Sequence, residues 1–482
     1  MGRLKNFLVL AFLFLILILF PFIEAHELTP KITFSCDFRY EKWNYFKFQD
    51  YQNNYAFYGL KLKPLIKIPF SYESTLNVGL NIVGLGNLPS RAVAPLPAGP
   101  LGLGANYFSS NRSLNNDSIV GIAVRELSFN YNCKKYSFKI GRFPFSDGKE
   151  LDNFLSKEVN FLKTIRITER MIGAFGFTYV ERAFDGFAFN YNPKDNIQLS
   201  LANFYPTFGA FEISTANRTI RNINLSYFSY SFAPNKDTDF RTYFINYKDS
   251  RNILKPSNTP NIRGKTDISS VGFHFVKVIR KENYNIDLMA WYNYQWGKWG
   301  EIDSNKITHK AYAYDIEIGY KFNKILWKPH FRVYYAFGSG DPNPNDDKHN
   351  TYFVFVPTGR KYALFPFYNY QNLKDLTFQL IAYPSRNLRL RIDYSILSLA
   401  NNQDGWYSGA GAFNDSSFGV AYKRSNGLSK LADVLSLDIS YNLSTNITIN
   451  LFYSLAQGKD LVKDIYHSSN STYLLLILTQ KI

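Results

Sequence analysis

The nine residues from Leu388 to Ile396, LRLRIDYSI, alternate strictly between apolar and polar side chains. Successive side chains of a β-strand point to opposite faces, so this segment has one apolar face and one charged face. A soluble sandwich would bury the apolar face against a second sheet. A closed barrel in lipid would turn it outward and keep the charged face in a wet lumen. The connections between such segments decide between the two folds.

About eighteen segments show this alternation, each close to the roughly ten residues that a tilted membrane strand needs. They cover approximately 31–42, 54–63, 71–83, 120–131, 136–145, 183–191, 197–205, 221–232, 238–249, 266–279, 285–297, 307–321, 326–338, 372–382, 388–398, 432–441, 447–455 and 472–480. A soluble propeller would instead show a repeated blade motif, which this sequence lacks.

The connections alternate between short and long along the whole chain. Short turns, many of them rich in Pro, Asn, Asp or Ser, are expected near 64–70, 132–135, 192–196, 233–237, 280–284, 322–325, 383–387 and 442–446. Long loops are expected near 84–119, 146–182, 206–220, 250–265, 339–371, 399–431 and 456–471, with shorter ones near 43–53 and 298–306. This rhythm predicts an all-β fold: a transmembrane antiparallel β-barrel of about 18 strands, with short periplasmic turns and long external loops.

Composition and the N-terminal segment agree with a barrel in an outer membrane. Aromatic residues make up 18% of the 482-residue chain, as expected if they form girdles at both membrane interfaces. The mean hydropathy of −0.23 argues against a helical membrane protein. Residues 1–25 combine a basic start, an apolar run and a small residue, Ala25, and are predicted to be a secretory signal. Residues 26–482 are then a single barrel domain of a Gram-negative-type bacterium.

The net charge of +17 points to an electropositive interior. Lysine and arginine are spread along the chain without a basic cluster, and an exported protein does not meet nucleic acid, so nucleic acid is excluded as a partner. The two cysteines, Cys36 and Cys133, exclude a disulfide scaffold. No cysteine or histidine spacing indicates a metal or another cofactor, and we predict none.

Three stretches of the sequence resemble the alginate-export family of outer-membrane porins. The first runs from Val124 to Tyr131 and continues to Ile140-Gly141-Arg142-Phe143; the second is TERMIGAFGFTYVERAFDG, 168–186. The third, 336–412, contains FGSGDPNPNDDKHNTY, VPTGRKYALF, QNLKDLTFQL, LRLRIDY and DGWYSGAGA. The resemblance implies an eighteen-stranded monomeric barrel with a basic, constricted lumen suited to an anionic uronate polymer.

A polyanion needs fixed cations in series along a narrow lumen, each holding a carboxylate weakly enough to release it. Guanidinium suits this role because it is always charged and binds carboxylate in a bidentate fork. By strand parity, the lumen-facing candidates are Arg39, Lys61, Lys63, Lys139, Arg332, Arg389 and Arg391.

The resemblance adds Arg125 and Arg142, which fall where the family's motifs place pore arginines. Arg125 shares a face with Leu127 and Phe129, so it reaches the lumen only if a bulge or a strand end intervenes. The predicted substrate pathway also includes Glu126, Arg182, Asp185 and Asp393. The alternative for the whole set is a structural network in which acidic residues neutralise the cations across neighbouring strands. Those acids are Asp37, Glu41, Glu126, Asp185, Asp287, Asp315, Glu317, Asp393 and Asp438.

Other sites have weaker support. The loop 146–182, with Gly173 and Gly176, is the best candidate for a constriction, its alternative being an ordinary external loop. The acids and amides of 341–347 lack the Gly and the closing Glu of an EF-hand loop, so solvated loop acids are expected there. His274 lies on a predicted strand, but the sequence assembles no triad around it, and we predict that the protein is not an enzyme.

The sequence therefore predicts an outer-membrane porin for passive diffusion of an anionic polysaccharide or related small anions. One alternative is a general or differently selective porin for small organic acids, sugars or hydrophobic compounds. From another class, a plugged structural or adhesive surface barrel would carry no current. The expected partners are the solute and outer-membrane lipids; the barrel is expected to be monomeric, and a periplasmic partner is compatible with the sequence.

Overall fold

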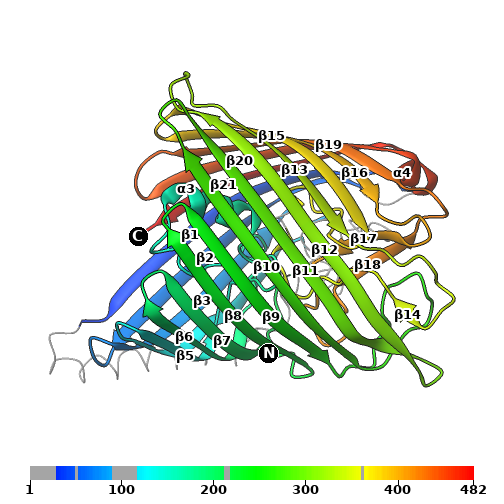
Figure 1. Ribbon diagram of the computed structural model, residues 1–482, viewed down its shortest axis with the longest axis horizontal. Coiled ribbons are helices and arrows are strands. Elements are labelled where there is room, and N and C mark those ends of the chain that lie inside the picture. The colour runs from blue at the N-terminus through cyan, green and yellow to red at the C-terminus, as the bar shows by residue number, and fades with distance from the viewer. Residues whose placement is uncertain (1–28, 49–52, 90–116, 211–217, 360–362) are drawn as a thin grey trace.

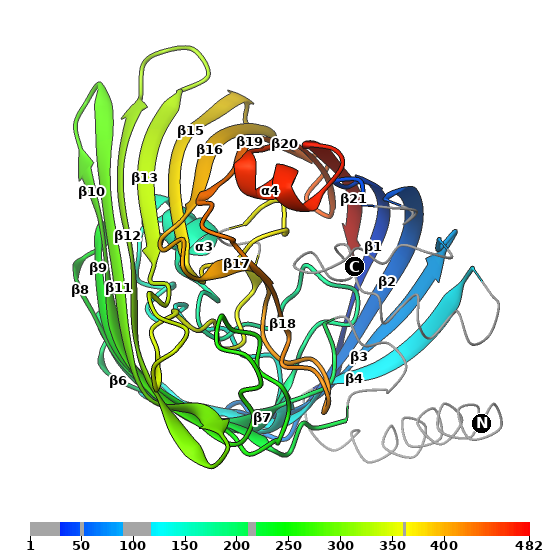
Figure 2. The same ribbon diagram turned by 90° about the vertical axis from the view of Figure 1, so that its right-hand side faces the viewer.

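The computed structural model describes residues 29–48, 53–89, 117–210, 218–359 and 363–482. The predicted signal at 1–25 lies outside the described residues. Eighteen long antiparallel strands form a sheet that closes into a barrel (Figures 1 and 2). They are β1 (Lys31–Asn44), β2 (Asn54–Pro69), β3 (Ser74–Gly86), β4 (Ile119–Asn132), β5 (Tyr136–Phe143), β6 (Phe184–Lys194), β7 (Ile197–Pro206), β8 (Ile223–Asn235), β9 (Thr238–Asp249), β10 (Thr266–Arg280), β11 (Tyr284–Ile302), β12 (Asn305–Phe322), β13 (His330–Gly338), β15 (Leu373–Ser385), β16 (Leu388–Leu399), β19 (Lys430–Asn442), β20 (Ile447–Gly458) and β21 (Asn470–Lys481).

Each long strand pairs with its neighbour in the sequence, and β1 closes the barrel by pairing with β21 from Ser35–Lys481 to Asn44–Thr472. This up-and-down order leaves no open sheet edge, which a strand in lipid could not tolerate. A two-residue strand, β14 (Lys348–His349), adds a short parallel pairing to β12, and β17 (Gly405–Gly409) and β18 (Val420–Arg424) form a separate hairpin. The predicted antiparallel barrel of eighteen strands is confirmed.

Three predicted boundaries are wrong. The predicted turn at 64–70 lies mostly within β2, which runs to Pro69. Pro64 is accommodated because the register of β2 with β3 passes from Leu62 directly to Leu65. The predicted loop at 298–306 is a two-residue turn, since β11 and β12 continue to Ile302 and from Asn305 with a bulge between Lys298 and Gly300. The strand predicted from 326 begins only at His330.

The two faces of the wall have the predicted polarity. On β16, Ile392 points outward and is 41% exposed, whereas the neighbouring Arg391 and Asp393 are buried inside the barrel. The exposed apolar side chains of the other strands repeat this pattern, as at Phe38, Ile316 and Leu478. No helix among the described residues is long and apolar enough to span a membrane.

The chain between β5 and β6 lies inside the barrel rather than outside it (Figure 2). Its helix α3 (Lys157–Arg166) begins at Ser156, whose hydroxyl accepts a hydrogen bond from the Val159 N–H. The N–H of Ser156 donates to the Lys236 carbonyl in the turn between β8 and β9, so the helix starts at the turn end of the barrel. We call residues 144–183 the inward loop. A second helix, α4 (Asp460–Ile465), lies at the other rim.

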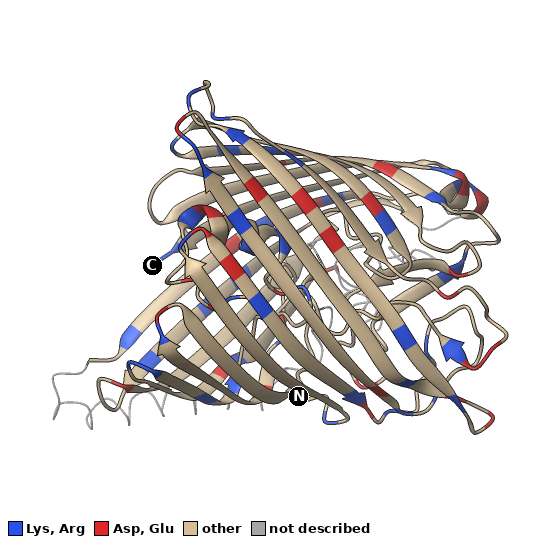
Figure 3. Cartoon of the chain, in the orientation of Figure 1, with Lys and Arg blue, Asp and Glu red and all other residues tan. Residues whose placement is uncertain are grey.

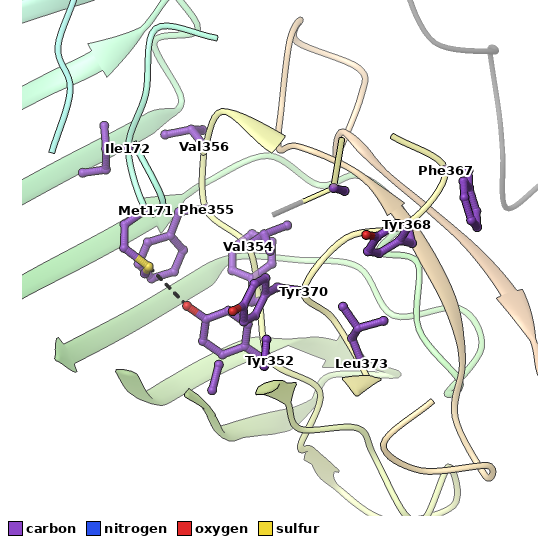
Figure 4. Packing of buried hydrophobic residues seen from close by; sticks show 14 of the residues in the cluster. Met171, Ile172, Tyr352, Val354, Phe355, Val356, Phe367, Tyr368, Tyr370 and Leu373 are labelled. Carbon is purple, nitrogen blue, oxygen red and sulfur yellow. Dashed lines mark hydrogen bonds between the residues drawn. The ribbon is translucent and has the colours of Figure 1, made fainter. Parts of the chain in front are cut away.

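The inward loop packs against the loop between β13 and β15. Met171 and Ile172 contact the segment 352–356, and the Tyr352 hydroxyl lies 3.2 Å from the Met171 sulfur (Figure 4). A parallel bridge joins Ile172 to Val356. This aromatic and aliphatic core fixes the two loops to each other within the barrel, and so it positions the charged groups that both loops carry.

Candidate functional site

A cluster of charged residues occupies the inner faces of β1, β2 and β4, where they meet the end of the inward loop. Its centre is Glu181, a buried carboxylate that contacts three cations. Lys61 Nζ lies 2.9 Å and Lys63 Nζ 3.4 Å from Glu181 Oε1, and Arg125 Nε lies 2.7 Å from Oε2. Although burial alone would raise it, the pKa of Glu181 lies well below its usual range because Lys61, Arg125 and Lys63 stabilise its charged form.

A second carboxylate extends the cluster. Asp37 Oδ2 lies 3.5 Å from Arg39 and 3.7 Å from Lys61. Arg39 also donates to the carbonyl of Phe177, and Lys61 donates to the carbonyls of Gly176 and Thr178, both at 3.1 Å. The buried cations Arg39 and Lys61 therefore fasten the inward loop to the wall.

Arg125 reaches the lumen through a β-bulge. Val124 pairs with Leu80 and Glu126 with Gly79, so Arg125 is the extra residue between two consecutive pairs. The bulge lets Arg125 and Glu126 both face inward, while Val124 and Leu127 face outward. The sequence predicted that Arg125 would reach the lumen only if a bulge or a strand end intervened, and this bulge is present. A charge in the lipid-facing position would cost about 2–4 kcal/mol near the bilayer midplane.

Lys139 lies lower on the same side of the lumen, nearer the turn end. Its Nζ is 3.4 Å from Glu126 Oε1, which also accepts hydrogen bonds from Asn77 and Ser128. The side chains of Lys63, Arg125 and Lys139 are 25%, 25% and 32% exposed, so solvent in the lumen reaches all three. We call these three residues the accessible cations.

The opposite wall is a neutralised network. Charged residues of both signs cross the middle of its strands (Figure 3). Arg332 lies 3.0 Å from Asp287 and 2.7 Å from Glu317, and Arg391 lies 2.5 Å from Asp393. All of these side chains are almost completely buried. The sequence predicted a substrate pathway for Arg332, Arg391 and Asp393, with a structural network of ion pairs as the alternative. The structure places all three in such a network.

The inward loop supplies the cations that complete this network. Arg166 lies 2.5 Å from Glu317 and 2.8 Å from Asp315, and Arg170 lies 2.7 Å from Asp315. Lys163 on α3 pairs with Asp239 at 3.2 Å. These contacts anchor α3 against β9 and β12. The prediction did not include them, although the spacing of 163 and 166 places two cations on one side of a helix and would have been the signal; Arg170 lies beyond the end of α3.

Among the other inward-facing cations predicted for the pathway, Arg389 is also reached by solvent, with a side chain 29% exposed. It lies 3.5 Å from Asp438 and its guanidinium stands 5.8 Å from the ring centre of Phe161 on α3. It is therefore separated from the accessible cations by the inward loop, and it lies nearer the turn end on the opposite wall.

Two predicted pathway residues lie on the outer face. Arg142 pairs in register with Leu127, which points outward, and Asp185 pairs with Arg142. Arg142 Nε lies 2.6 Å from Asp185 Oδ1, and the Thr219 hydroxyl also donates to Asp185. The register of β4 with β5 has no shift between Leu127–Arg142 and Asn132–Ser137, so no bulge turns Arg142 inward. Their assignment to the lumen is corrected: they form a closed ion pair at the loop end of β5 and β6.

Arg182 is buried away from the lumen solvent. Its guanidinium donates to the carbonyls of Gly173, Val356, Ala410 and Ala412, at 2.9–3.3 Å. Burial lowers the pKa of Arg182 to about 10. It ties the inward loop to two external loops, and so a permeating solute cannot reach the guanidinium that was predicted to bind it.

The structure holds His274 in a structural role. It is buried, and its Nε2 lies 2.7 Å from Asp239 Oδ2, the carboxylate that also binds Lys163. Within the described residues, no group of three or more histidine, cysteine, aspartate or glutamate side chains is arranged to hold a metal ion.

Comparison with known proteins shows the family to which this sequence belongs. The sequence model of the family described as Alginate export matches residues 164–472. No curated protein matches the sequence. Solved structures with a similar fold include the outer membrane protein OpdK from Pseudomonas aeruginosa (10% identity, TM-score 0.54, 94% of this chain and 99% of that chain covered).

OccAB3 from Acinetobacter baumannii has 12% identity and a TM-score of 0.56, with 94% of this chain and 99% of that chain covered. A BenF-like porin from Pseudomonas fluorescens Pf-5 has 10% identity and a TM-score of 0.56, with 94% and 98% covered. At these identities the likeness concerns the fold, which is that of an eighteen-stranded outer-membrane porin.

Proposed function

Because this chain belongs to the Alginate export family of outer-membrane channels, we propose that its lumen conducts hydroxylated anions, from uronate polymers to related small acids, by passive diffusion. The path runs along the inner faces of β2, β4 and β5. The observation that carries the proposal is the placement of Lys63, Arg125 and Lys139 there, accessible to solvent, while most other inward-facing cations of the predicted set are buried in ion pairs or carbonyl contacts.

The acidic partners set how strongly these cations hold a solute. Lys63 and Arg125 share a single carboxylate, Glu181, which Lys61 also contacts. Their positive charge is therefore only partly compensated, so a permeating carboxylate is attracted without being trapped. Several weak sites in series suit conduction better than one tight site.

A narrower function, conduction of small organic anions only, is favoured by the inward loop. The ion pairs of Arg166 and Arg170 with Asp315 and Glu317 hold α3 within the barrel, where it occupies cross-section that a polymer would need. One similar solved structure, OpdK of Pseudomonas aeruginosa, contains vanillate. The two functions differ in whether an oligomer longer than a few units can enter the lumen.

The test is single-channel recording from the refolded barrel under a salt gradient, with oligouronates of increasing length added. We expect an anion-selective current that oligouronates block. The double variant Lys63→Gln/Lys139→Gln should shift the reversal potential towards cation selectivity and weaken the block by roughly tenfold, since two accessible ion contacts are together worth about 1–2 kcal/mol.

Lys306→Gln is the control outside the lumen, because it removes a positive charge at the exposed tip between β11 and β12. An equal shift in the control would contradict a pathway along β2–β5. Block by uronate monomers but not by longer oligomers would leave the narrower function. A protein that carries no current would be the plugged structural barrel.

A further inference from the structure

A recess of about 570 Å³ opens on the inner wall between Lys63 and Arg125 and the turn end of the barrel, and Lys139 is part of its lining. Its floor is formed by β2–β6 and one side by the first residues of the inward loop. A volume of this size is typical of sites for small organic ligands. The lining residues are Lys67, Thr75, Asn77, Asn130, Asn132, Ser137, Phe138, Lys139, Phe143, Pro144, Phe145, Ser146, Lys149, Ala188 and Asn190.

The lining carries three ammonium groups and no carboxylate. Lys139 has an acidic partner, Glu126, at 3.4 Å. Lys67 and Lys149 have no carboxylate within 4 Å among the residues that the structure describes. Lys67 pairs in register with the inward-facing Asn77, and Lys149 extends from the inward loop on the other side. The recess therefore presents its cations from two sides to anything within it.

A row of amides and hydroxyls lies between these lysines. Asn190 donates to Ser137 at 2.9 Å, and Asn130 donates to the carbonyl and hydroxyl of Ser128, both at 3.2 Å. The side-chain oxygen of Asn130 is buried and has no hydrogen-bond donor in the structure. A buried acceptor without a partner costs about 1–3 kcal/mol. Because Asn130 lines the recess, a small rotation of its side chain would present this acceptor to a hydroxyl group of a ligand.

Aromatic rings complete the lining. Phe143 and Phe145 stand at the start of the inward loop, and Lys139 Nζ lies 5.6 Å from the ring centre of Phe143. Such rings pack against the C–H faces of a ligand while its polar edges reach the amides and the lysines. Ammonium groups, an unpartnered acceptor and aromatic rings together match a molecule with carboxylates, hydroxyls and apolar faces.

We propose that this recess is a binding site for a hydroxylated carboxylate the size of one to three sugar rings, such as the end of a uronate chain. In barrels of this kind the turn end is the periplasmic end, so the site would hold a solute there, at Lys139, before it meets Lys63 and Arg125. The inference rests on the proposed function and adds a saturable binding step on one side of the membrane. A small inorganic anion would use the lysines but not Asn130.

The test is calorimetric titration of the full refolded barrel in detergent micelles, which measures binding without conduction. Trimannuronate is expected to bind saturably, and the neutral sugar maltotriose at least roughly tenfold more weakly, because it lacks the carboxylates. Gluconate, a small hydroxy acid, distinguishes the two possible ligands, a small free acid and the end of a uronate chain. If gluconate binds as tightly as trimannuronate, the site is one for small acids rather than for chain ends.

Two variants report on different parts of the recess. Lys67→Gln/Lys149→Gln should weaken trimannuronate binding roughly tenfold. Asn130→Ala should weaken binding of trimannuronate and gluconate by about threefold or more but leave binding of propionate, which has no hydroxyl, unchanged. Lys306→Gln is again the control. Circular dichroism, together with the change in electrophoretic mobility that a folded barrel shows on heating in detergent, confirms that each variant is folded.

The outcomes distinguish the recess from the proposed function. Unchanged trimannuronate affinity in both recess variants would overturn the recess proposal, even where the wild-type channel is anion-selective. If the channel is not anion-selective but trimannuronate still binds and the recess variants weaken that binding, the proposed conduction would be overturned. A binding site at the turn end would remain.

Discussion

At the scale of single residues, solvent exposure distinguishes inward-facing cations that have the same position in the sequence pattern. Lys63 and Arg332 are both inward-facing cations on long strands. The Lys63 side chain is 25% exposed and contacts a shared carboxylate, whereas Arg332 is fully buried between Asp287 and Glu317. A buried cation with two partners holds the fold, because removing it takes a charged partner from each of two buried carboxylates.

We therefore expect Arg332→Met to lower the free energy of unfolding by about 3–5 kcal/mol. Lys63→Met, a comparable loss of charge at an accessible position, should lower it by less than about 1 kcal/mol. Urea unfolding of the refolded barrel in lipid vesicles, followed by tryptophan fluorescence, measures both. Equal effects of the two variants would contradict the division between buried and accessible cations.

At the scale of elements, the loops above the barrel share a buried acidic pair. The Asp341 backbone N–H donates to Asp404 Oδ2 at 3.0 Å, and the hydroxyls of Thr351 and Tyr407 donate to the same carboxylate. Burial raises the pKa of Asp341 to about 7 and that of Asp404 to about 6. Asp341 and Asp404 thus join the two loops that carry them, and the folded arrangement of these loops is most stable when both carboxyls are protonated.

The direction of the pH dependence follows from these pKa values. Both carboxyls ionise near pH 4 when unfolded and near pH 6–7 when folded, so the folded loops bind more protons. Their stability is fully present below about pH 4 and is lost as the pH rises through 6–7. Limited proteolysis of the loops should be faster at pH 8 than at pH 5, with protease activity normalised on a disordered peptide.

Asp341→Asn/Asp404→Asn should remove most of this difference, because neither amide titrates. Asp415→Asn, at an exposed loop carboxylate that pairs with Arg218, is the control and should leave the difference intact. A protease sensitivity that is independent of pH in the wild-type protein would show that the acidic pair does not control the loops.

At the scale of the whole molecule, the barrel is defined by opposite polarity on its two sides. Its outer surface is a belt of exposed apolar side chains such as Phe38, Ile316 and Ile392, and its interior holds the charged network and the inward loop. In a soluble protein such a surface would aggregate; in an outer membrane it is solvated by lipid.

A charge placed on this belt tests that orientation. Ile392→Lys, in the middle of β16, should destabilise the barrel in vesicles by about 2–4 kcal/mol, whereas Leu443→Lys, in the turn between β19 and β20, should cost about 0–1 kcal/mol. Guanidinium unfolding of both variants in the same vesicles gives the comparison. Equal costs would place these two residues at the same depth.

The sequence by itself determined the strands, their inner and outer faces and the alternation of short and long connections. These properties depend on a period of two residues and on local turn residues, so they can be read from neighbours in the chain. Two of the three boundary errors, at 64–70 and 298–306, arose where Pro64 and a bulge at Lys298 departed from that local pattern.

Only the tertiary structure decided what each inward charge does. Arg166 meets Asp315 across 149 residues of sequence, and Arg125 meets Glu181 across 56, so no local pattern reveals either pair. The same holds for Arg182, whose carbonyl partners come from three loops. Arg125 reaches the lumen because a bulge shifts the parity of β4, whereas the register of β4 with β5 has no such shift at Arg142. Ion pairs depend on distances in space, which the closure of the barrel and the folding of the inward loop set.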